Sequence, residues 1–113
     1  MSINDEAAWH HFLATLERDE PELRRACGWA RAFWFRVSIR SDVRLPLPNT
    51  MRSEIGVLLS WRVGAKHLDI DIAPDCQMDW FFRDSHGDVT DGSDDPVAEL
   101  PDAFWQYAMQ VSR

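Results

Sequence analysis

Alternation of apolar and polar residues between positions 55 and 83 constrains the fold of this chain more than any other feature. Every second residue from Ile55 to Val63 is apolar, and the same alternation returns over 66–72 and 78–83. A period of two residues is typical of a β-strand with one buried face. The sequence therefore predicts three consecutive strands over 55–63, 66–72 and 78–83.

Two short turns predict how these strands pair. Gly64-Ala65 leaves a two-residue hairpin loop, with glycine at the first central position as a type II′ turn requires. At 74–76 a two-residue loop would pair Ile72 with Gln77, whereas a three-residue loop pairs Ile72 with Met78. We predict the three-residue loop, because apolar residues then face apolar residues throughout the sheet.

The same register predicts which polar side chains share the other face of the sheet. Its three cross-strand rows are Arg62–His67–Arg83, Ser60–Asp69–Phe81 and Leu58–Asp71–Asp79. Like charges directly opposite each other cost stability, which makes the pairing of Asp71 with Asp79 unusual. A solvated face explains it most simply. A carboxylate pair for a metal or for general acid–base chemistry is the alternative.

Helical spacing appears before and after the strands. Apolar residues recur at i, i+3, i+4 and i+7 over 4–18 and again over 21–31, where Pro21 suits the first helical position. A third helix is predicted from Pro101 to about Val111. The expected fold is therefore one α+β domain over 1–113, with two N-terminal helices, an antiparallel meander of three to four strands, and a C-terminal helix packed on one sheet face.

Three segments between these elements are more ambiguous. Residues 33–40 alternate and predict a strand, although a helix extended to Val37 also fits. Prolines within 43–48 allow an extended or edge segment, and 49–54 is polar and loop-like. Residues 84–99 contain six acids and no Lys or Arg, which predicts a solvated loop.

The spacings that mark common catalytic and metal sites are absent from the sequence: there is no H-E-x-x-H, C-x-x-C, G-x-S-x-G, P-loop or G-x-G-x-x-G. The acidic segment fails the calcium-loop pattern, because Val89 stands where glycine is required and Asp95 where glutamate is usual. Cys27 lies on the apolar stripe of the second helix, and Cys76 lies in a turn. We therefore expect no metal, no cofactor and no enzymatic activity.

Charge is unevenly distributed around a net value of −7. Residues 23–53 carry seven arginines against one aspartate, whereas both flanking regions are acidic. The acidic total argues against a dedicated nucleic-acid binder, which needs a basic footprint. No apolar run is long enough to span a bilayer, and the first residues do not resemble a secretory signal, so we expect a cytoplasmic protein without membrane contact.

Six tryptophans exceed the predicted need of one small core. Trp29 and Trp34 do not fit the apolar stripe of the second helix, and arginines lie beside them. Tryptophan with arginine is the usual composition of a binding hot spot. Stacking of arginine on tryptophan, or a helix buried on two sides, explains the same pattern equally well.

The run from Leu59 to Arg83, with Trp61, Gly64, Pro74-Asp75 and Trp80-Phe81, resembles a hairpin segment of small uncharacterised bacterial proteins. The resemblance covers less than a quarter of the chain. It implies a bacterial or phage source and carries no activity with it.

These observations favour a small acidic module that binds a basic partner protein, such as an inhibitor, antitoxin, immunity protein or phage anti-defence (anti-CRISPR-like) protein. Its candidate contact residues are Asp69, Asp71, Asp79, Asp88, Asp91, Asp94, Asp95, Trp29 and Trp34. The alternatives are a small metal-assisted hydrolase that uses Asp69, Asp71 and Asp79, and a homodimeric structural protein.

Overall fold

Two helices precede five strands in the computed structural model, which describes residues 3–38, 46–75, 77–84, 86 and 89–94. The architecture is therefore α+β. In chain order the elements are α1 (Ile3–Asp19), the short 3₁₀ helix η1 (Pro21–Leu23), α2 (Arg24–Ser38), β1 (Asn49–Arg52), β2 (Val57–Val63), β3 (Lys66–Ile72), β4 (Met78–Arg83) and β5 (Val89–Asp94).

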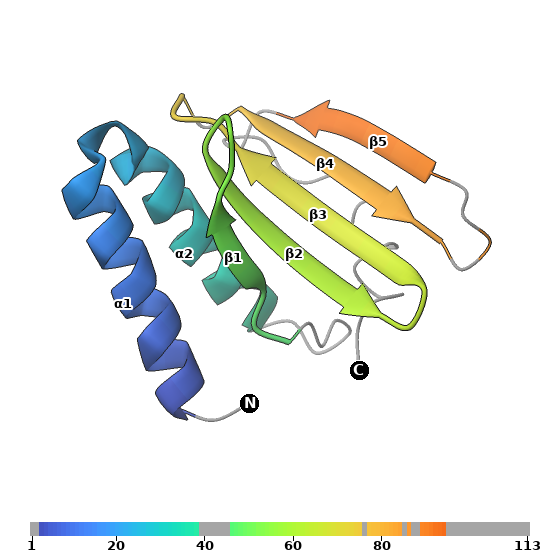
Figure 1. Ribbon diagram of the computed structural model, residues 1–113, viewed down its shortest axis with the longest axis horizontal. Helices are drawn as coiled ribbons and strands as arrows, with labels where there is room; N and C mark the ends of the chain where they lie inside the picture. Colours follow the sequence, from blue (N-terminus) through green and yellow to red (C-terminus); the bar gives the residue numbers. More distant parts are fainter. Residues whose placement is uncertain (1–2, 39–45, 76, 85, 87–88, 95–113) are drawn as a thin grey trace.

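The strands form one antiparallel sheet in the order β1-β2-β3-β4-β5, so each strand pairs only with its neighbours in sequence (Figure 1). Both predicted registers are confirmed, because Trp61 lies opposite Leu68 and Ile72 lies opposite Met78. Gly64 has a φ of 61°, a conformation that glycine adopts without steric cost. The apolar alternation therefore settles the pairing of the three central strands.

The sheet is wider than predicted at both edges. The loop expected over 49–54 is wrong for Asn49–Arg52, which form β1, and the loop expected over 84–99 is wrong for Val89–Asp94, which form β5. Both segments are too polar to show alternation, and backbone pairing with β2 and β4 places them in the sheet. The first predicted strand in turn begins at Val57, which leaves Ile55 exposed.

The helical layer also differs from the prediction at one point. The strand predicted over 33–40 is wrong for Phe33 to Ser38, because α2 continues through these residues. Ala30, Phe33 and Trp34 are all buried at helical spacing, so packing on two sides of α2 outweighs the alternation. The predicted C-terminal helix over 101–111 lies outside the described residues.

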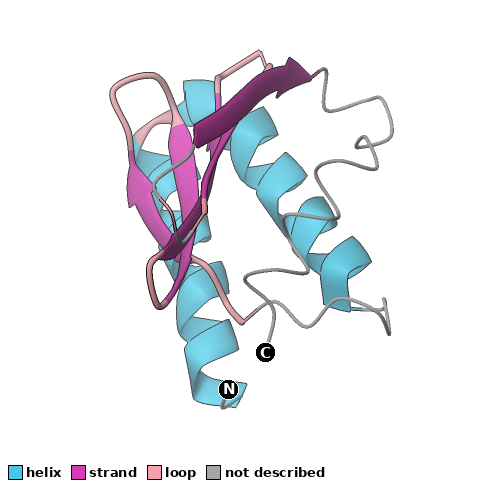
Figure 2. Cartoon of the chain, turned by 90° about the vertical axis from the view of Figure 1, so that its right-hand side faces the viewer, coloured by secondary structure: helices cyan, strands magenta, loops and turns pink. Residues whose placement is uncertain are grey.

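Both helices leave the same face of the sheet uncovered. α2 lies behind the sheet in the view of Figure 1, and α1 lies beside the edge strand β1 (Figures 1 and 2). We call the face that packs toward α2 the inner face and the opposite face the outer face. Within the described residues, no helix is long and apolar enough to cross a membrane.

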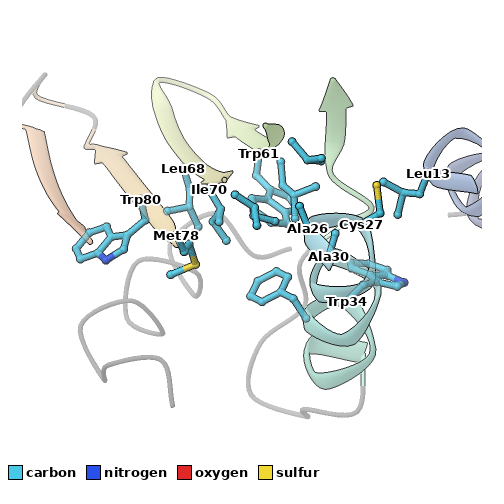
Figure 3. Packing of buried hydrophobic residues seen from close by; sticks show 14 of the residues in the cluster. Leu13, Ala26, Cys27, Ala30, Trp34, Trp61, Leu68, Ile70, Met78 and Trp80 are labelled. Atoms are coloured by element: carbon cyan, nitrogen blue, oxygen red, sulfur yellow. The ribbon is translucent and has the colours of Figure 1, made fainter. Parts of the chain in front are cut away.

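One apolar cluster joins the helices to the inner face (Figure 3). It contains Trp9 and Leu13 of α1; Leu23 of η1; Ala26, Cys27, Ala30, Phe33 and Trp34 of α2; and Val57, Leu59, Trp61, Leu68, Ile70, Ile72, Met78, Trp80 and Phe82 of the sheet. Two indole N–H groups find acceptors at its margin: Trp9 Nε1 donates to Thr50 Oγ1 at 2.7 Å, and Trp61 Nε1 donates to the carbonyl of Pro46 at 2.7 Å. The first contact holds β1 against α1, and the second holds the segment before β1 against β2.

Candidate functional site

Polar side chains gather on the outer face, where the predicted rows are confirmed and extended. β1 adds Asn49 opposite Ser60 and Met51 opposite Leu58, and β5 adds Asp91 opposite Phe81 and Ser93 opposite Asp79. The middle rows therefore run across all five strands. Because β1 to β4 lie in register, the outer-face residues of these four strands are held at fixed spacings.

Ser60, His67 and Asp69 form the tightest polar cluster on this face. The Ser60 Oγ lies 3.0 Å from His67 Nε2, and Asp69 Oδ1 lies 2.7 Å from the same nitrogen. The His67 and Asp69 side chains are only 19% and 23% exposed. Proximity in this cluster follows directly from the register, which sets Ser60 opposite Asp69 and His67 two residues before it.

This cluster contains the residue types of a serine-hydrolase triad but not its geometry. In a triad the serine contacts one imidazole nitrogen and the aspartate holds the other, so that the ring can take a proton from the hydroxyl while the carboxylate stabilises the resulting charge. Here Ser60 and Asp69 both approach Nε2. A single nitrogen cannot accept the serine proton and donate to the aspartate at once, so the arrangement does not support nucleophilic catalysis.

Asp69 is left with an unmet hydrogen-bonding demand. Although its Oδ1 lies 2.7 Å from His67 Nε2, it is buried and receives no hydrogen bond from any described residue. The short separation thus lacks the alignment of a hydrogen bond, since the Nε2 contact that is properly aligned goes to Ser60. A buried carboxylate oxygen without a donor costs about 1–3 kcal/mol.

A hollow of about 600 Å³ opens beside this cluster. It is lined by Pro46, Leu47, Asn49, Met51, Leu58, Ser60, Trp61, Arg62, His67 and Asp69. Its size lies within the range of ligand-binding clefts, about 300–1,000 Å³. Acceptors and apolar side chains therefore line the same cleft at the β1 side of the outer face.

Asp71 lies one row away and is tied to the turn between β1 and β2. The Ser53 hydroxyl donates to Asp71 Oδ1 at 2.7 Å and accepts from the Gly56 backbone N–H at 2.9 Å. The pKa of Asp71 is raised, first by burial and then by repulsion from Asp79 and Asp69, while the Ser53 hydrogen bond and Arg52 oppose the rise. The predicted opposition of Asp71 and Asp79 is thus present and carries an electrostatic cost.

The residues of the metal-hydrolase alternative share the outer face but do not converge. Asp69, Asp71 and Asp79 occupy two adjacent rows of β3 and β4. In the described part of the chain, no three His, Cys, Asp or Glu side chains come together closely enough to hold a metal ion. Cys27 is buried as predicted, and burial, with repulsion from Glu17, raises the pKa of its thiol to about 11. The protonated thiol is a poor nucleophile at neutral pH.

The two candidate tryptophans lie in or against the core. Trp34 is only 5% exposed, contacts Trp9 edge-on at 6.1 Å and donates to Glu6 Oε1 at 3.3 Å. Trp29 is half-buried and stacks on Phe33 at 5.3 Å. The premise that Trp34 lies off the buried stripe is therefore wrong, because α2 is buried on two sides, and no exposed tryptophan–arginine patch remains at that position.

The basic stretch over 23–53 is less separated from acidic residues in the fold than along the sequence, because ion pairs join them. Arg31 makes two 3.2 Å hydrogen bonds to the carboxylate of Glu17, and Arg52 contacts both carboxylate oxygens of Glu20 at 3.1 Å. Two arginines of the basic stretch are thus offset by Glu17 of α1 and by Glu20, which follows that helix. Arg24, Arg25 and Arg36 remain exposed on the helical side.

Two acidic residues of the predicted loop lie in a strand. Asp91 and Asp94 belong to β5, where their register partners are Phe81 and Met78. Asp88 and Asp95 lie outside the described residues. Among the described residues, Asp69, Asp71 and Asp79 bring three carboxylates onto one face of the sheet.

Ser60 and His67 were not selected from the sequence as site residues. The signal for them was present in the predicted rows, which already placed Ser60 beside Asp69 and put His67 on the same face. The cleft itself had no such signal, because its wall depends on β1 and on Pro46 and Leu47. Comparisons of the chain with protein-family models, with curated proteins and with solved structures find no match.

Proposed function

We propose that the protein is a non-enzymatic binding module that docks a basic partner protein on the outer face of its sheet. The classes that fit this role are inhibitors, antitoxins, immunity proteins and phage anti-defence (anti-CRISPR-like) proteins. Small acidic proteins of this kind gain fast association from charge complementarity with the enzyme or nucleic-acid-binding protein that they block.

The observation that carries the proposal is the set of carboxylates on a sheet face that neither helix covers. Asp71 and Asp79 lie directly opposite each other, and Asp69 lies in the adjacent row. Their mutual repulsion contributes to the raised pKa of Asp71. A cationic partner would relieve that repulsion on binding, so part of the electrostatic cost of the free protein becomes binding free energy in the complex.

Binding is also favoured over catalysis by the geometry of the remaining polar groups. Ser60 and Asp69 compete for one imidazole nitrogen, and Cys27 is buried in the apolar cluster. A rigid, pre-formed sheet face with these groups suits recognition, because little conformational entropy is lost when a partner docks on it.

Site-specific photo-cross-linking in the native host tests the proposal. A photoreactive phenylalanine analogue replaces Phe81 on the outer face, and a matched variant carries it at Phe35, which is 64% exposed on α2. We expect a cross-linked partner of basic composition from position 81 and none from position 35. Cross-linking only from position 35, or only to a second copy of this chain, would contradict the proposal.

The isolated partner then allows a charge test. Changing Asp69, Asp71 and Asp79 together to Asn should slow association by roughly tenfold at low salt and flatten its salt dependence, because steering depends on the local field. The control changes Asp19 to Asn and Glu22 and Glu54 to Gln, which removes the same net charge from exposed positions elsewhere. Equal slowing by both triple variants would mean that net charge alone matters and would overturn docking on the outer face.

A further inference from the structure

The cleft beside β1 brings one carboxylate together with apolar side chains. Asp69 lies within it together with His67 and Ser60, while Met51 and Leu58 supply apolar surface on neighbouring strands. Met51 is 45% exposed, so its side chain offers accessible apolar surface beside the carboxylate. We call this cleft the Asp69 pocket.

The chemistry of the pocket selects a ligand that donates hydrogen bonds and carries positive charge. Asp69 lines the pocket and its side chain is 23% exposed, so part of its carboxylate can be reached from the cleft. Asp71, in the next row of the same strand, adds negative charge close by. An anion would be repelled by both carboxylates, and a neutral ligand would leave the charge of Asp69 uncompensated.

The shape of the pocket favours an arginine side chain over a lysine side chain. A guanidinium presents parallel N–H groups that match a carboxylate, is more weakly hydrated than an ammonium, and loses less on entering a partly apolar cleft. Its three methylene groups can lie against Met51 and Leu58 while the charged end reaches the floor. Arginine buried in a pocket is also among the most frequent hot spots of protein interfaces.

We infer that the Asp69 pocket receives one arginine side chain of the partner protein, with the guanidinium donating to the Asp69 carboxylate and the aliphatic stem packed on Met51 and Leu58. The inference rests on the proposed function, since it names the partner group that anchors the outer face. Arg62 also lines the pocket, and it makes no ion pair with Asp69 in the described part of the chain.

The direct test uses the full chain and three small probes: N-acetyl-arginine amide, N-acetyl-lysine amide and N-acetyl-citrulline amide. Citrulline has the shape of arginine without its charge. Binding is followed by NMR through the His67 imidazole and the backbone amides of β2 and β3. We expect the arginine probe to bind with a Kd of roughly millimolar, as suits one isolated side chain, and the citrulline probe at least tenfold more weakly.

Matched variants locate the site. Asp69→Asn should weaken binding of the arginine probe by about tenfold, whereas Asp79→Asn, which removes the same charge from the same face, should change it less than about twofold. Near-UV circular dichroism checks that both variants retain the fold. The comparison of arginine with citrulline needs no variant, so the inference remains testable if Asp69→Asn does not fold.

Three results would overturn the inference: equal binding of arginine and citrulline, equal losses in the two variants, or a large gain of probe affinity in Arg62→Ala. The last would show that Arg62 already occupies the carboxylate in solution. A partner that cross-links at position 81 but binds Asp69→Asn as tightly as the wild type would overturn the arginine anchor and leave the proposed function intact. Probe binding without any cross-link at position 81 would overturn the proposed function and with it the assignment of the arginine to a protein.

Discussion

The inner and outer faces of the same strands differ in how far the chain itself satisfies their side chains. On the inner face, Leu68, Ile70 and Ile72 of β3 are fully buried, and no described polar side chain is buried with them. On the outer face of that strand, Asp69 has a buried oxygen without a donor and Asp71 has a raised pKa. The apolar side chains of the inner face are therefore buried within the chain. On the outer face, the carboxylates of Asp69 and Asp71 are not fully compensated by neighbouring side chains. The first face serves folding, and we propose that the second serves recognition.

The largest loss of stability should come from placing a carboxylate, the group typical of the outer face, on the inner face. Ile70→Asp buries a charge at the centre of β3 and should cost more than about 4 kcal/mol, enough to unfold a typical domain. The control Arg24→Asp introduces the same group at an exposed position at the start of α2, away from the sheet, and should stay within about 0.5 kcal/mol. Denaturant unfolding and near-UV circular dichroism measure both. A folded Ile70→Asp with an unchanged near-UV spectrum would show that the two faces are not distinguished as described.

A smaller effect should come from a backbone approach at the end of β2. A Cβ added at Gly56 would overlap the carbonyl oxygen of Ile72, so Gly56→Ala must displace the strand and should cost about 3 kcal/mol. Gly28, in α2, has no atom within 4 Å of such a Cβ. Gly28→Ala should therefore stabilise the protein by about 0.5–1 kcal/mol through helix propensity. Thermal melts of the pair give the comparison, and a neutral Gly56→Ala would contradict the tight contact between β2 and β3.

The smallest effect should appear as a change in pH dependence. Burial is the main cause that raises the pKa of Asp71 above its ordinary value of 3.8, so the folded protein holds this proton more tightly than the unfolded chain does. The resulting stability is fully present below pH 3.8 and is lost as the pH rises through the folded pKa. Asp71→Asn should remove that loss and gain less than about 1 kcal/mol at neutral pH.

Chemical denaturation of Asp71→Asn and wild type from pH 3 to pH 7 measures this difference. The exposed control Glu22→Gln should leave the slope of stability against pH unchanged. A wild type that gains stability relative to Asp71→Asn as the pH rises would mean that ionised Asp71 is stabilised by its neighbours, contrary to the cost assigned to the outer face.

The centre of the sheet could be predicted because two independent signals agreed there. Alternation predicted which residues of 57–82 face the core. The loop lengths at Gly64-Ala65 and 74–76 predicted the pairing of the strands, and a wrong register would have placed apolar residues opposite polar ones. Phe33 to Ser38 carried only one signal, since its apolar residues fit both a strand and a helix. Trp34 is buried against Trp9 of α1, and this packing favours the helix.

The edges and the pocket could not be predicted for a different reason. Asn49–Arg52 and Val89–Asp94 are strands because a partner strand offers them backbone hydrogen bonds, and their own side chains give no sign of it. Residues of β1 line part of the Asp69 pocket, so the pocket could not be predicted from the sequence without that strand. The position of Asp69, the carboxylate that lines the pocket, in contrast followed from the register of β2 with β3.

The uninterrupted meander of the sheet has a consequence for how the chain folds. No strand crosses over another, and the loops between β1 and β4 span only a few residues, so the ends that must meet are always close along the chain. The entropy lost in closing such loops is small, and proteins with mostly local contacts fold faster than those with distant pairings. A hairpin formed early by β2 and β3 can therefore serve as the template on which β4 and β1 add in turn, each at the low entropic cost of a short connection.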